Sequence, residues 1–522
     1  MKQRQPIRML LNGAITLALL MSTALFATPT MNQTNLTITS SLGQIKGLVN
    51  DDIATFYALP YAKNPFTEAR RFQAPEAIES WQGVFDSTTM QPPVPQPSRG
   101  QTTELVGAPG DLTLNIWTPT ASITSAQKLP VMVWIPGGAF IREDASEAVY
   151  DGSSFARNDV VVVTINYRVG VDGFMHLPGA PDNRGILDQI AALEWVKDNI
   201  AEFGGDPDRV TLFGQSAGAE SVAILLGTEK ANGLYHQAII QSPPMQAMTQ
   251  TEAERVAQAF AAQLNVPATI AGIASVPFPQ LVAAVTQMGN AIQNHDDWGM
   301  LSWGGTAFLP VIDRTLIEQT PMANLANNAN PDIPVIVGST AQEARLYLVP
   351  GGIIDRIEAK QTTQFLDDLK LNDSALTVYS KANTEQSEGD IYAAIQSDYT
   401  FRMPAVHIAE QLVKNGNTVW QYNFAWQSPA FGGRLGAAHF VDVPFTFNTI
   451  DRDAATDFVG DQPPAALATE IHNQWLHFAK QGNADWSTYQ PNKPISMRFD
   501  IDSAEVSNPD ADIRKLWQQY HF

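Results

Sequence analysis

The hydrophobic positions of this chain form short β-branched runs that alternate with helical stripes. Residues 131–135, 160–165 and 210–213 are almost entirely apolar, as expected for strands that are buried on both faces of a sheet. From residue 186 to residue 203, apolar side chains recur every three or four positions, which predicts an amphipathic helix. Strands that alternate with helices indicate an α/β protein with a mostly parallel sheet covered by helices on both sides.

Two more strands are predicted in the C-terminal half. Residues 334–337 form another apolar run, and aromatic side chains occupy every second position from 420 to 426. Such alternation predicts a strand with one aromatic face. A Thr-x-x-Glu pattern at 251–254 predicts a capping box at the start of a helix. Residues 270–330 and 345–415 have weaker patterns, so we expect them to pass over the sheet as insertions.

Residues 1–27 have the pattern of a secretory signal peptide. Lys2, Arg4 and Arg8 precede a mostly apolar stretch that ends among small residues suited to cleavage. The alternative is an uncleaved anchor, but an Asn-Gly pair interrupts the apolar stretch and leaves it short for a stable membrane span. We therefore expect an exported protein with no stable span after cleavage, and a single domain over residues 28–522.

Charge and cysteine content narrow the possible functions. The chain has 32 Lys and Arg against 53 Asp and Glu, a formal net charge of −21, so nucleic-acid binding is not expected. Cysteine is absent, which excludes thiolate catalysis and Cys-ligated metal sites. Extracellular eukaryotic proteins of this size usually carry disulfides, so an exported chain without cysteine indicates a bacterial periplasm or medium.

A Gly-x-Ser-x-Gly motif at residues 214–218 supplies a candidate nucleophile, Ser216. The motif follows the run at 210–213 and opens an Ala-rich helical stretch, which predicts the strained strand–turn–helix called a nucleophile elbow. The alternative is a structural serine in a Gly-rich turn. A serine hydroxyl is a weak nucleophile at neutral pH, so it needs a base, an acid that orients the base, and donors for the developing oxyanion.

The chain offers a candidate for each of these roles. His439 stands in a Gly-Ala-Ala-His sequence after the aromatic strand, and Glu343 follows the strand predicted before it. A Pro-Gly-Gly-Ala-Phe loop at 136–140 follows another strand and can present consecutive backbone N–H groups. The order Ser, acid, His is that of α/β-hydrolases. Two other acids are alternatives to the glutamate, Asp442 and Glu220.

Taken together, these motifs resemble the type-B carboxylesterases, the family that includes bacterial para-nitrobenzyl esterases, animal carboxylesterases and cholinesterases. The matching blocks cover nearly all of the chain after the leader and lie at residues 59–62, 71–72, 114–117, 166–168, 183–189, 203–218 and 475–486. The resemblance implies an α/β-hydrolase fold with long loop and helical insertions over the active site. It also implies an exported serine carboxylesterase that hydrolyses neutral carboxylic esters.

The resemblance further implies a role for individual residues. The nucleophile, acid and base are implied to be Ser216, Glu343 and His439. The donors of the oxyanion hole are implied to be the backbone N–H groups of Gly138, Ala139 and Ala217. Acyl transfer through such groups needs neither a metal ion nor an organic cofactor, so we expect none. The expected partner is a small-molecule ester, and the oligomeric state stays open.

The sequence departs from the family pattern at three places. Pro136 stands where a His is usual; proline has no N–H, but the implied donors lie two and three residues later, so we expect the hole to survive. Gln215 stands where a Glu is usual, which removes a negative charge beside the nucleophile and makes a preference for cationic substrates unexpected. Val94 and Asp111 stand where many members carry a disulfide pair.

Two alternative functions also fit the sequence. One is a specialised hydrolase of a bulky xenobiotic, toxin, lactone or amide substrate, since the same residues can serve such reactions. The other, from a different class, is a catalytically silent binding or adhesion protein. Family members of that kind typically lack the serine, whereas here all three implied catalytic positions are filled, which favours an enzyme.

Overall fold

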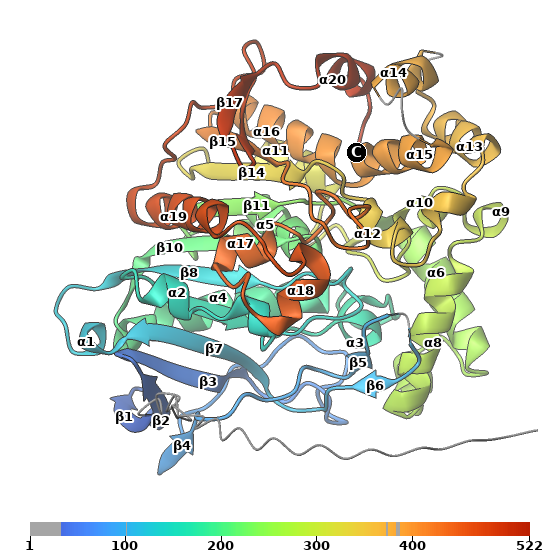
Figure 1. The fold of residues 1–522 in the computed structure, drawn as a ribbon. Coiled ribbons are helices and arrows are strands. Elements are labelled where there is room, and N and C mark those ends of the chain that lie inside the picture. Colours follow the sequence, from blue (N-terminus) through green and yellow to red (C-terminus); the bar gives the residue numbers. More distant parts are fainter. Residues whose placement is uncertain (1–32, 101, 372–373, 383–386) are drawn as a thin grey trace, which may run out of the picture.

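The computed structural model describes residues 33–100, 102–371, 374–382 and 387–522 (Figure 1). The predicted signal peptide at residues 1–27 therefore lies outside the described residues. Within the described ranges, we find no helix with the length and apolar character needed to cross a membrane. That residues 28–522 form a single domain stays a prediction.

Most strands of the described ranges join one 13-stranded sheet with a parallel centre. The parallel strands follow the order β9 (Val161–Ile165), β8 (Leu129–Ile135), β10 (Gly205–Gln215), β11 (Gln237–Gln241), β14 (Val335–Thr340), β15 (Val419–Phe424) and β16 (Ile495–Phe499). Antiparallel strands extend both edges: β1 (Thr34–Ser40), β2 (Gly43–Asn50), β3 (Ile53–Ala62) and β7 (Leu112–Pro119) beside β9, and β17 (Ala504–Ser507) beside β16, while β4 (Val84–Asp86) pairs with β2. The predicted mostly parallel sheet is confirmed, and four predicted runs correspond to β8, β9, β10 and β14.

The sheet buries both of its faces. Successive side chains of a strand point to opposite sides, so Val131, Val133 and Ile135 of β8 pack in one core while Met132 and Trp134 pack in a second. The first core contains side chains of α4 (Arg184–Asn199), α5 (Ala217–Leu226) and α16 (Met403–Asn415). The second contains side chains of α2 (Ser153–Ala156), α17 (Val443–Phe447) and α19 (Ala465–Gln481). Helices therefore cover both faces, as the apolar strands predict.

Two further predicted elements are confirmed with small changes at their ends. The amphipathic stripe from 186 to 203 forms α4 and continues as the 3₁₀ helix η2 (Ile200–Phe203). The aromatic strand is β15, and all four alternate aromatics, Trp420, Tyr422, Phe424 and Trp426, pack in the second core. Trp426 lies just beyond the end of the strand, and its burial explains why the alternation outlasts the strand.

Helical insertions occupy most of the predicted excursions. They comprise α7 (Ile270–Ala274), α8 (Phe278–Ala291), α9 (His295–Trp298), α10 (Leu301–Gly304), α11 (Pro321–Asn328), α12 (Arg345–Leu348), α13 (Ala359–Leu369), α14 (Ala375–Ala382) and α15 (Glu388–Ser397). The separately predicted helix before them is α6 (Gln250–Gln263). In Figure 1, α6, α8, α9, α10 and α13 lie together to the right of the sheet. Side chains of α12, α13 and α15 form a third core that is separate from the two sheet cores.

Short elements connect these parts. The short helices are α1 (Thr120–Ile123), α3 (Gly170–Phe174), α18 (Asp453–Val459) and α20 (Ala511–Trp517), with the 3₁₀ turns η1 (Ala148–Tyr150), η3 (Glu229–Ala231) and η4 (Ile354–Arg356) and the π-helical turn η5 (Asp398–Arg402). Two small sheets pair β5 (Gln96–Pro97) with β6 (Leu105–Val106), and β12 (Met248–Thr249) with β13 (Val311–Ile312).

The capping box of α6 is not the one that the sequence pattern predicts. Thr249, rather than Thr251, is the N-cap; its side chain accepts from the backbone N–H of Glu252, and the Glu252 carboxylate accepts from the N–H of Thr249 at 2.8 Å. Both threonines have a glutamate three residues later, so the pattern alone does not separate them. The helix begins after Thr249 because β12 ends there.

Candidate active site

The predicted site residues gather where the parallel strands end. Ser216 follows β10 directly, and Glu343 comes three residues after β14. The predicted hole loop follows β8, and His439 lies on the long connection after β15. Because the carboxyl ends of parallel strands meet at one edge of a sheet, this topology brings together residues that are far apart in the sequence.

The chain turns sharply at Ser216, between β10 and α5. The backbone of Ser216 has φ 59° and ψ −128°, a strained conformation for a residue with a side chain. A Cβ atom on Gly218 would overlap the carbonyl oxygen of Ile135, so α5 can approach β8 only with glycine there. The Ser216 N–H donates to the Gln241 carbonyl at 2.9 Å, which ties the turn to β11. The strand–turn–helix expected from the motif is present.

Glu343 and His439 contact each other from two separate loops. The imidazole Nδ1 lies 2.5 Å from the Glu343 Oε2 atom, and the two residues are only 0% and 3% exposed. The other carboxylate oxygen accepts from the Ser242 hydroxyl at 2.6 Å and from the Thr340 N–H at 2.7 Å. An ionised carboxylate can only accept hydrogen bonds, so the imidazole directs an N–H at Nδ1 toward Glu343. The other ring nitrogen, Nε2, then keeps a lone pair that can accept a proton.

The Nε2 atom of His439 contacts Gln215 in this conformation. The Gln215 side-chain amide nitrogen lies 3.0 Å from Nε2 and 3.3 Å from Nδ1, so the amide packs against the imidazole and is not aligned with one ring nitrogen. The Ser216 hydroxyl has no hydrogen-bond partner among the described residues, and the residue is 9% exposed. The amide of the residue before the serine therefore lies against the imidazole.

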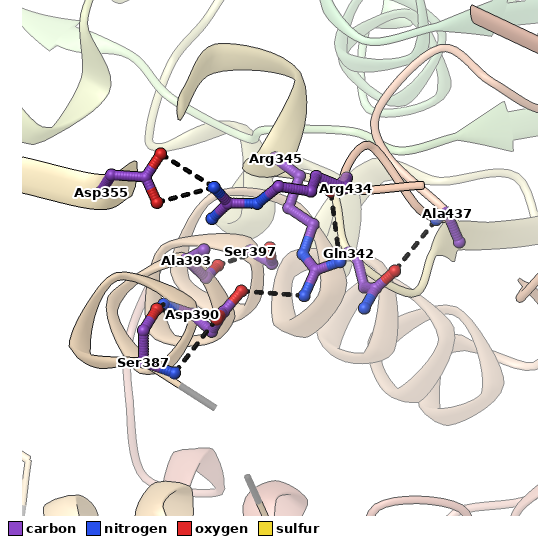
Figure 2. Close-up of polar contacts among 9 residues, drawn as sticks. All are labelled: Gln342, Arg345, Asp355, Ser387, Asp390, Ala393, Ser397, Arg434 and Ala437. Carbon is purple, nitrogen blue, oxygen red and sulfur yellow. Dashed lines mark hydrogen bonds and ion pairs between the residues drawn. The ribbon is translucent and has the colours of Figure 1, made fainter. Parts of the chain in front are cut away.

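Polar contacts brace the loops that carry the acid and the base (Figure 2). The Ala437 N–H donates to the Gln342 side-chain oxygen at 3.0 Å, and the Gln342 N–H donates to the Ala437 carbonyl at 2.8 Å. Farther out, Arg345 pairs with Asp390 of α15 at 3.0 Å and donates to the backbone carbonyl of Arg434 at 3.3 Å. These contacts flank the acid and base residues and hold their loops at a fixed separation.

Asp442, one of the two alternative acids, lies apart from the imidazole. Its carboxylate accepts from the Gln241 amide at 3.1 Å and makes no hydrogen bond to His439. Burial, and then the charge of Glu343, raise the pKa of Asp442 to about 6. Of the three candidate acids, Glu343 is the one that contacts the imidazole.

Glu220, the other alternative acid, is fully buried on α5. Neither of its carboxylate oxygens has a hydrogen-bond partner within the described residues. Burial raises the pKa of Glu220 well above its ordinary value, and the nearby Gln246 backbone opposes this only weakly. The neutral acid is therefore the form that this position favours.

Replacing Glu220 with glutamine is expected to stabilise the protein at alkaline pH. Since the folded-state pKa is raised, the wild type has its full stability below the unfolded-state pKa and loses stability as the pH rises toward the folded value. Glutamine has almost the same volume and does not ionise. We expect the melting temperature of the variant to exceed that of the wild type by about 2 °C at pH 8. At pH 5 the difference should be much smaller; a difference that does not depend on pH would contradict ionisation of Glu220 as its cause.

The loop after β8 presents the backbone groups predicted to form the oxyanion hole. Gly138 has φ 132°, and a Cβ atom there would overlap the Arg142 carbonyl oxygen, so this turn requires glycine. The N–H groups of Ile141 and Arg142 both donate to the Gly138 carbonyl at 3.2 Å and close the turn. Within the described residues, the N–H groups of Gly138 and Ala139 donate to no acceptor. Ala217 is the first residue of α5, so its N–H has no acceptor within the helix.

The departures from the family pattern are accommodated locally. The Pro136 carbonyl accepts from the Tyr167 hydroxyl at 2.8 Å, which anchors the start of the hole loop without needing an N–H. Val94 and Asp111 line one cavity of about 200 Å³ together with other residues of the Pro-rich segment, and neither residue contacts the paired acid and base.

Three further contacts of the acid–base pair were not predicted from the sequence: Phe401 and Tyr347 beside His439, and Ser242 beside Glu343. The Phe401 ring of η5 stacks on the His439 imidazole with ring centres 4.2 Å apart, and Tyr347 of α12 lies at 5.7 Å. Ser242 is the first residue after β11, and its place after an apolar run is a signal that could have marked it. No sequence signal marks Phe401, because it belongs to an insertion far from the motif.

Comparison with known proteins identifies the family. The model described as "Carboxylesterase family" matches residues 34–514. The para-nitrobenzyl esterase of Bacillus subtilis (strain 168) is 32% identical over 499 residues, which cover 92% of this chain and 97% of that protein. The phenmedipham hydrolase of Pseudarthrobacter oxydans is 31% identical over 488 residues, which cover 90% and 96%. The crystal structure of a Geobacillus stearothermophilus carboxylesterase aligns with a TM-score of 0.81 at 31% identity, over 92% of this chain and 100% of that one.

These similarities extend over the whole sheet and its insertions. They confirm the α/β-hydrolase fold that the resemblance implied, and they favour an enzyme over a silent binding protein. The chain belongs to the carboxylesterase family and is a serine carboxylic ester hydrolase.

Proposed function

We propose that this chain hydrolyses neutral carboxylic esters by two-step acyl transfer through Ser216. The supporting observation is that the Ser216 turn, the Glu343–His439 contact at 2.5 Å and the free N–H groups of the hole loop share one edge of the sheet. Ser216 Oγ attacks the ester carbonyl carbon, and His439 Nε2 takes its proton and delivers it to the leaving alcohol. Water then attacks the acyl-enzyme through the same base and releases the carboxylic acid.

The other proposed residues stabilise charge that develops during these steps. Glu343 keeps the His439 proton on Nδ1 and stabilises the imidazolium that forms when the serine proton is taken. The N–H groups of Gly138, Ala139 and Ala217 donate to the oxygen of the tetrahedral intermediate.

The hydrolysis of p-nitrophenyl acetate and butyrate tests this function directly. We expect turnover by the purified chain, inhibition by a serine-directed organophosphate, and labelling of the peptide that contains Ser216 by mass spectrometry. Absence of both hydrolysis and labelling would rule out the proposed mechanism.

Neutral esters are expected to be better substrates than choline esters. Gln215 carries no charge, and burial disfavours the ionised form of Glu220, so the surroundings of Ser216 offer a cation little compensation. We expect kcat/KM for butyrylcholine to be at least about tenfold below that for 3,3-dimethylbutyl butyrate, its neutral isostere, because desolvating an uncompensated cation is costly. Acid release in a pH-stat measures both; equal values would contradict the expectation.

A bulkier ester-like substrate is the second candidate. The relative named phenmedipham hydrolase aligns with 90% of this chain, so a protein of similar architecture is named for the hydrolysis of phenmedipham. A panel of p-nitrophenyl esters with acyl chains from two to twelve carbons, with phenmedipham included, separates the two candidates by their kcat/KM values.

We also propose that the chain is exported, on the basis of the signal-peptide pattern at residues 1–27. Expression of the whole chain in a bacterium, followed by fractionation and N-terminal sequencing, tests this. We expect a periplasmic or secreted form that begins near residue 28, and a full-length cytoplasmic product would contradict export.

A further inference from the structure

Arg142 ends the hole loop with a guanidinium that has no partner. It makes no side-chain hydrogen bond, and no Asp or Glu oxygen lies within 4 Å of it, among all residues that the structure describes. The residue is partly buried, and burial lowers the pKa of Arg142 together with repulsion from Arg99. An arginine still carries its charge at neutral pH. A partly buried cation without a counterion is costly, so this arrangement points to an external anion.

None of the described acids near Arg142 forms an ion pair with it. Glu147 lies nearby, before η1, but it pairs with Arg99 of the Pro-rich segment. Asp144 accepts hydrogen bonds from Ser146. Burial raises the pKa of the adjacent Glu143 well above the ordinary range, so this carboxyl favours its neutral form. Arg142 is therefore distinguished by the absence of an ion pair, and not by a net positive charge around it.

The side chain of Arg142 begins beside the predicted hole loop. Its Cγ lies next to the position that a Cβ of Gly138 would take, so the arginine stem packs on the predicted hole turn. Burial of the hydroxyl raises the pKa of Tyr347, and the nearby charge of Arg142 opposes that rise. The Tyr347 ring centre is 5.7 Å from that of His439. Tyr347 as a whole is 48% exposed although its hydroxyl is buried, and Arg142 itself is only partly buried, so this rim of the site is open to solvent.

The side chains around Ser216 present little free negative charge to an anion. Gln215 carries no charge, and Glu220 favours its neutral form. Glu343 is engaged by three donors, including His439. Asp442, with a pKa of about 6, is buried and accepts from Gln241 and Tyr422. A carboxylate that enters beside the hole loop would therefore meet one guanidinium without an ion pair, while the nearby acids are neutral or already hydrogen-bonded.

We propose that Arg142 binds a carboxylate carried by the ester substrate, so that half-esters of dicarboxylic acids or esters of carboxylated alcohols are preferred substrates. The planar guanidinium can hold both carboxylate oxygens while the ester carbonyl lies in the adjacent hole. This inference rests on the proposed function, because it extends the same site from neutral esters to anionic ones.

Paired substrates test the proposal on each side of the ester. On the acyl side, mono-(4-nitrophenyl) adipate is compared with 4-nitrophenyl hexanoate; on the alcohol side, 4-acetoxybenzoate is compared with its methyl ester. The Arg142→Met variant is expected to lower kcat/KM at least about tenfold for the anionic member of one pair, with less than about threefold change for both neutral members. The pair that responds identifies which side carries the carboxylate.

Two control variants separate charge from fold. Arg142→Lys keeps the charge without the planar fork, so it should retain part of the preference. Arg157→Met removes one positive charge from an exposed position on the C-terminal side of α2 and should leave all four values unchanged. An equal loss on anionic and neutral esters would assign Arg142 a structural role and overturn the proposal, as would no loss on either anionic ester.

Binding to an inactive variant separates this inference from the proposed function. Calorimetric titration of Ser216→Ala with the anionic esters should show binding that Arg142→Met weakens at least about tenfold. If the wild type hydrolyses no ester but this difference is observed, the proposed function fails and the carboxylate site stands. If neutral esters are hydrolysed and no difference is observed, the carboxylate site fails alone.

Discussion

Replacing Ser216 with alanine is expected to lower kcat for p-nitrophenyl butyrate by about 10⁴–10⁶-fold. The hydroxyl is the proposed attacking group, and among the described residues no alternative hydroxyl is hydrogen-bonded to His439. The turn itself should survive, because alanine keeps a Cβ at φ 59° and the backbone bond to Gln241 does not involve the hydroxyl. A stopped assay at high enzyme concentration measures the residual rate.

Ser221 provides the matched control for this variant. It lies on α5, the helix that Ser216 precedes, is fully buried, and accepts a hydrogen bond from Gln189 at 3.0 Å, away from the paired acid and base. Ser221→Ala should change kcat by less than about threefold, with a modest loss of stability for the unpaired amide. A Ser216→Ala protein that retains its melting temperature and more than a tenth of the wild-type rate would rule out Ser216 as the nucleophile.

The parts of the fold that the sequence predicts well are those set by local burial. A strand covered on both faces must be apolar throughout, so β8, β9, β10 and β14 are visible as runs of β-branched residues. The aromatic side chains at alternate positions of β15 all pack in the second core, so their spacing predicts the strand in the same way. The elbow is predictable because its backbone geometry requires glycine at fixed offsets from the serine.

The contacts that define the site are less visible because they join distant segments. Glu343 and His439 are 96 residues apart and meet through backbone pairing of their loops, which leaves no pattern in either segment alone. Sequence order also does not decide among Glu343, Asp442 and Glu220; their burial and hydrogen-bond partners distinguish them. The Gln215 contact with His439 depends on a side-chain rotamer, which the sequence does not encode locally.

Arg142 is another residue whose surroundings cannot be predicted from the sequence. As a residue in a loop, it resembles an ordinary surface charge, and its lack of a counterion becomes visible only when Arg99 and Glu147 are seen to pair with each other. The charge balance of the whole chain, −21, gives no hint of a cation without an ion pair, because long-range charge and local pairing are independent. The proposed binding of a carboxylate at this rim depends on which charged side chains remain without an ion pair after folding.

Replacing Glu343 with glutamine is expected to lower kcat by about 10³–10⁴-fold, whereas Asp442→Asn should lower it by less than about tenfold. Glutamine at 343 can still accept from Ser242 and Thr340, but it no longer stabilises the imidazolium and can hold the wrong tautomer of His439. Asp442 makes no hydrogen bond to the imidazole, so its removal leaves the orientation of His439 intact.

The pH dependence separates the two acids further. With a pKa of about 6, Asp442 is mostly neutral below pH 6 and ionised above it, so Asp442→Asn changes the charge of the site only above pH 6. Any loss of kcat/KM in Asp442→Asn should therefore grow between pH 5 and pH 7, while the loss in Glu343→Gln should be large at both. Measuring kcat/KM for p-nitrophenyl butyrate with both variants across this range decides between them. If Asp442→Asn abolished turnover while Glu343→Gln remained active, the orienting acid would be Asp442, and the contact at 2.5 Å would be structural.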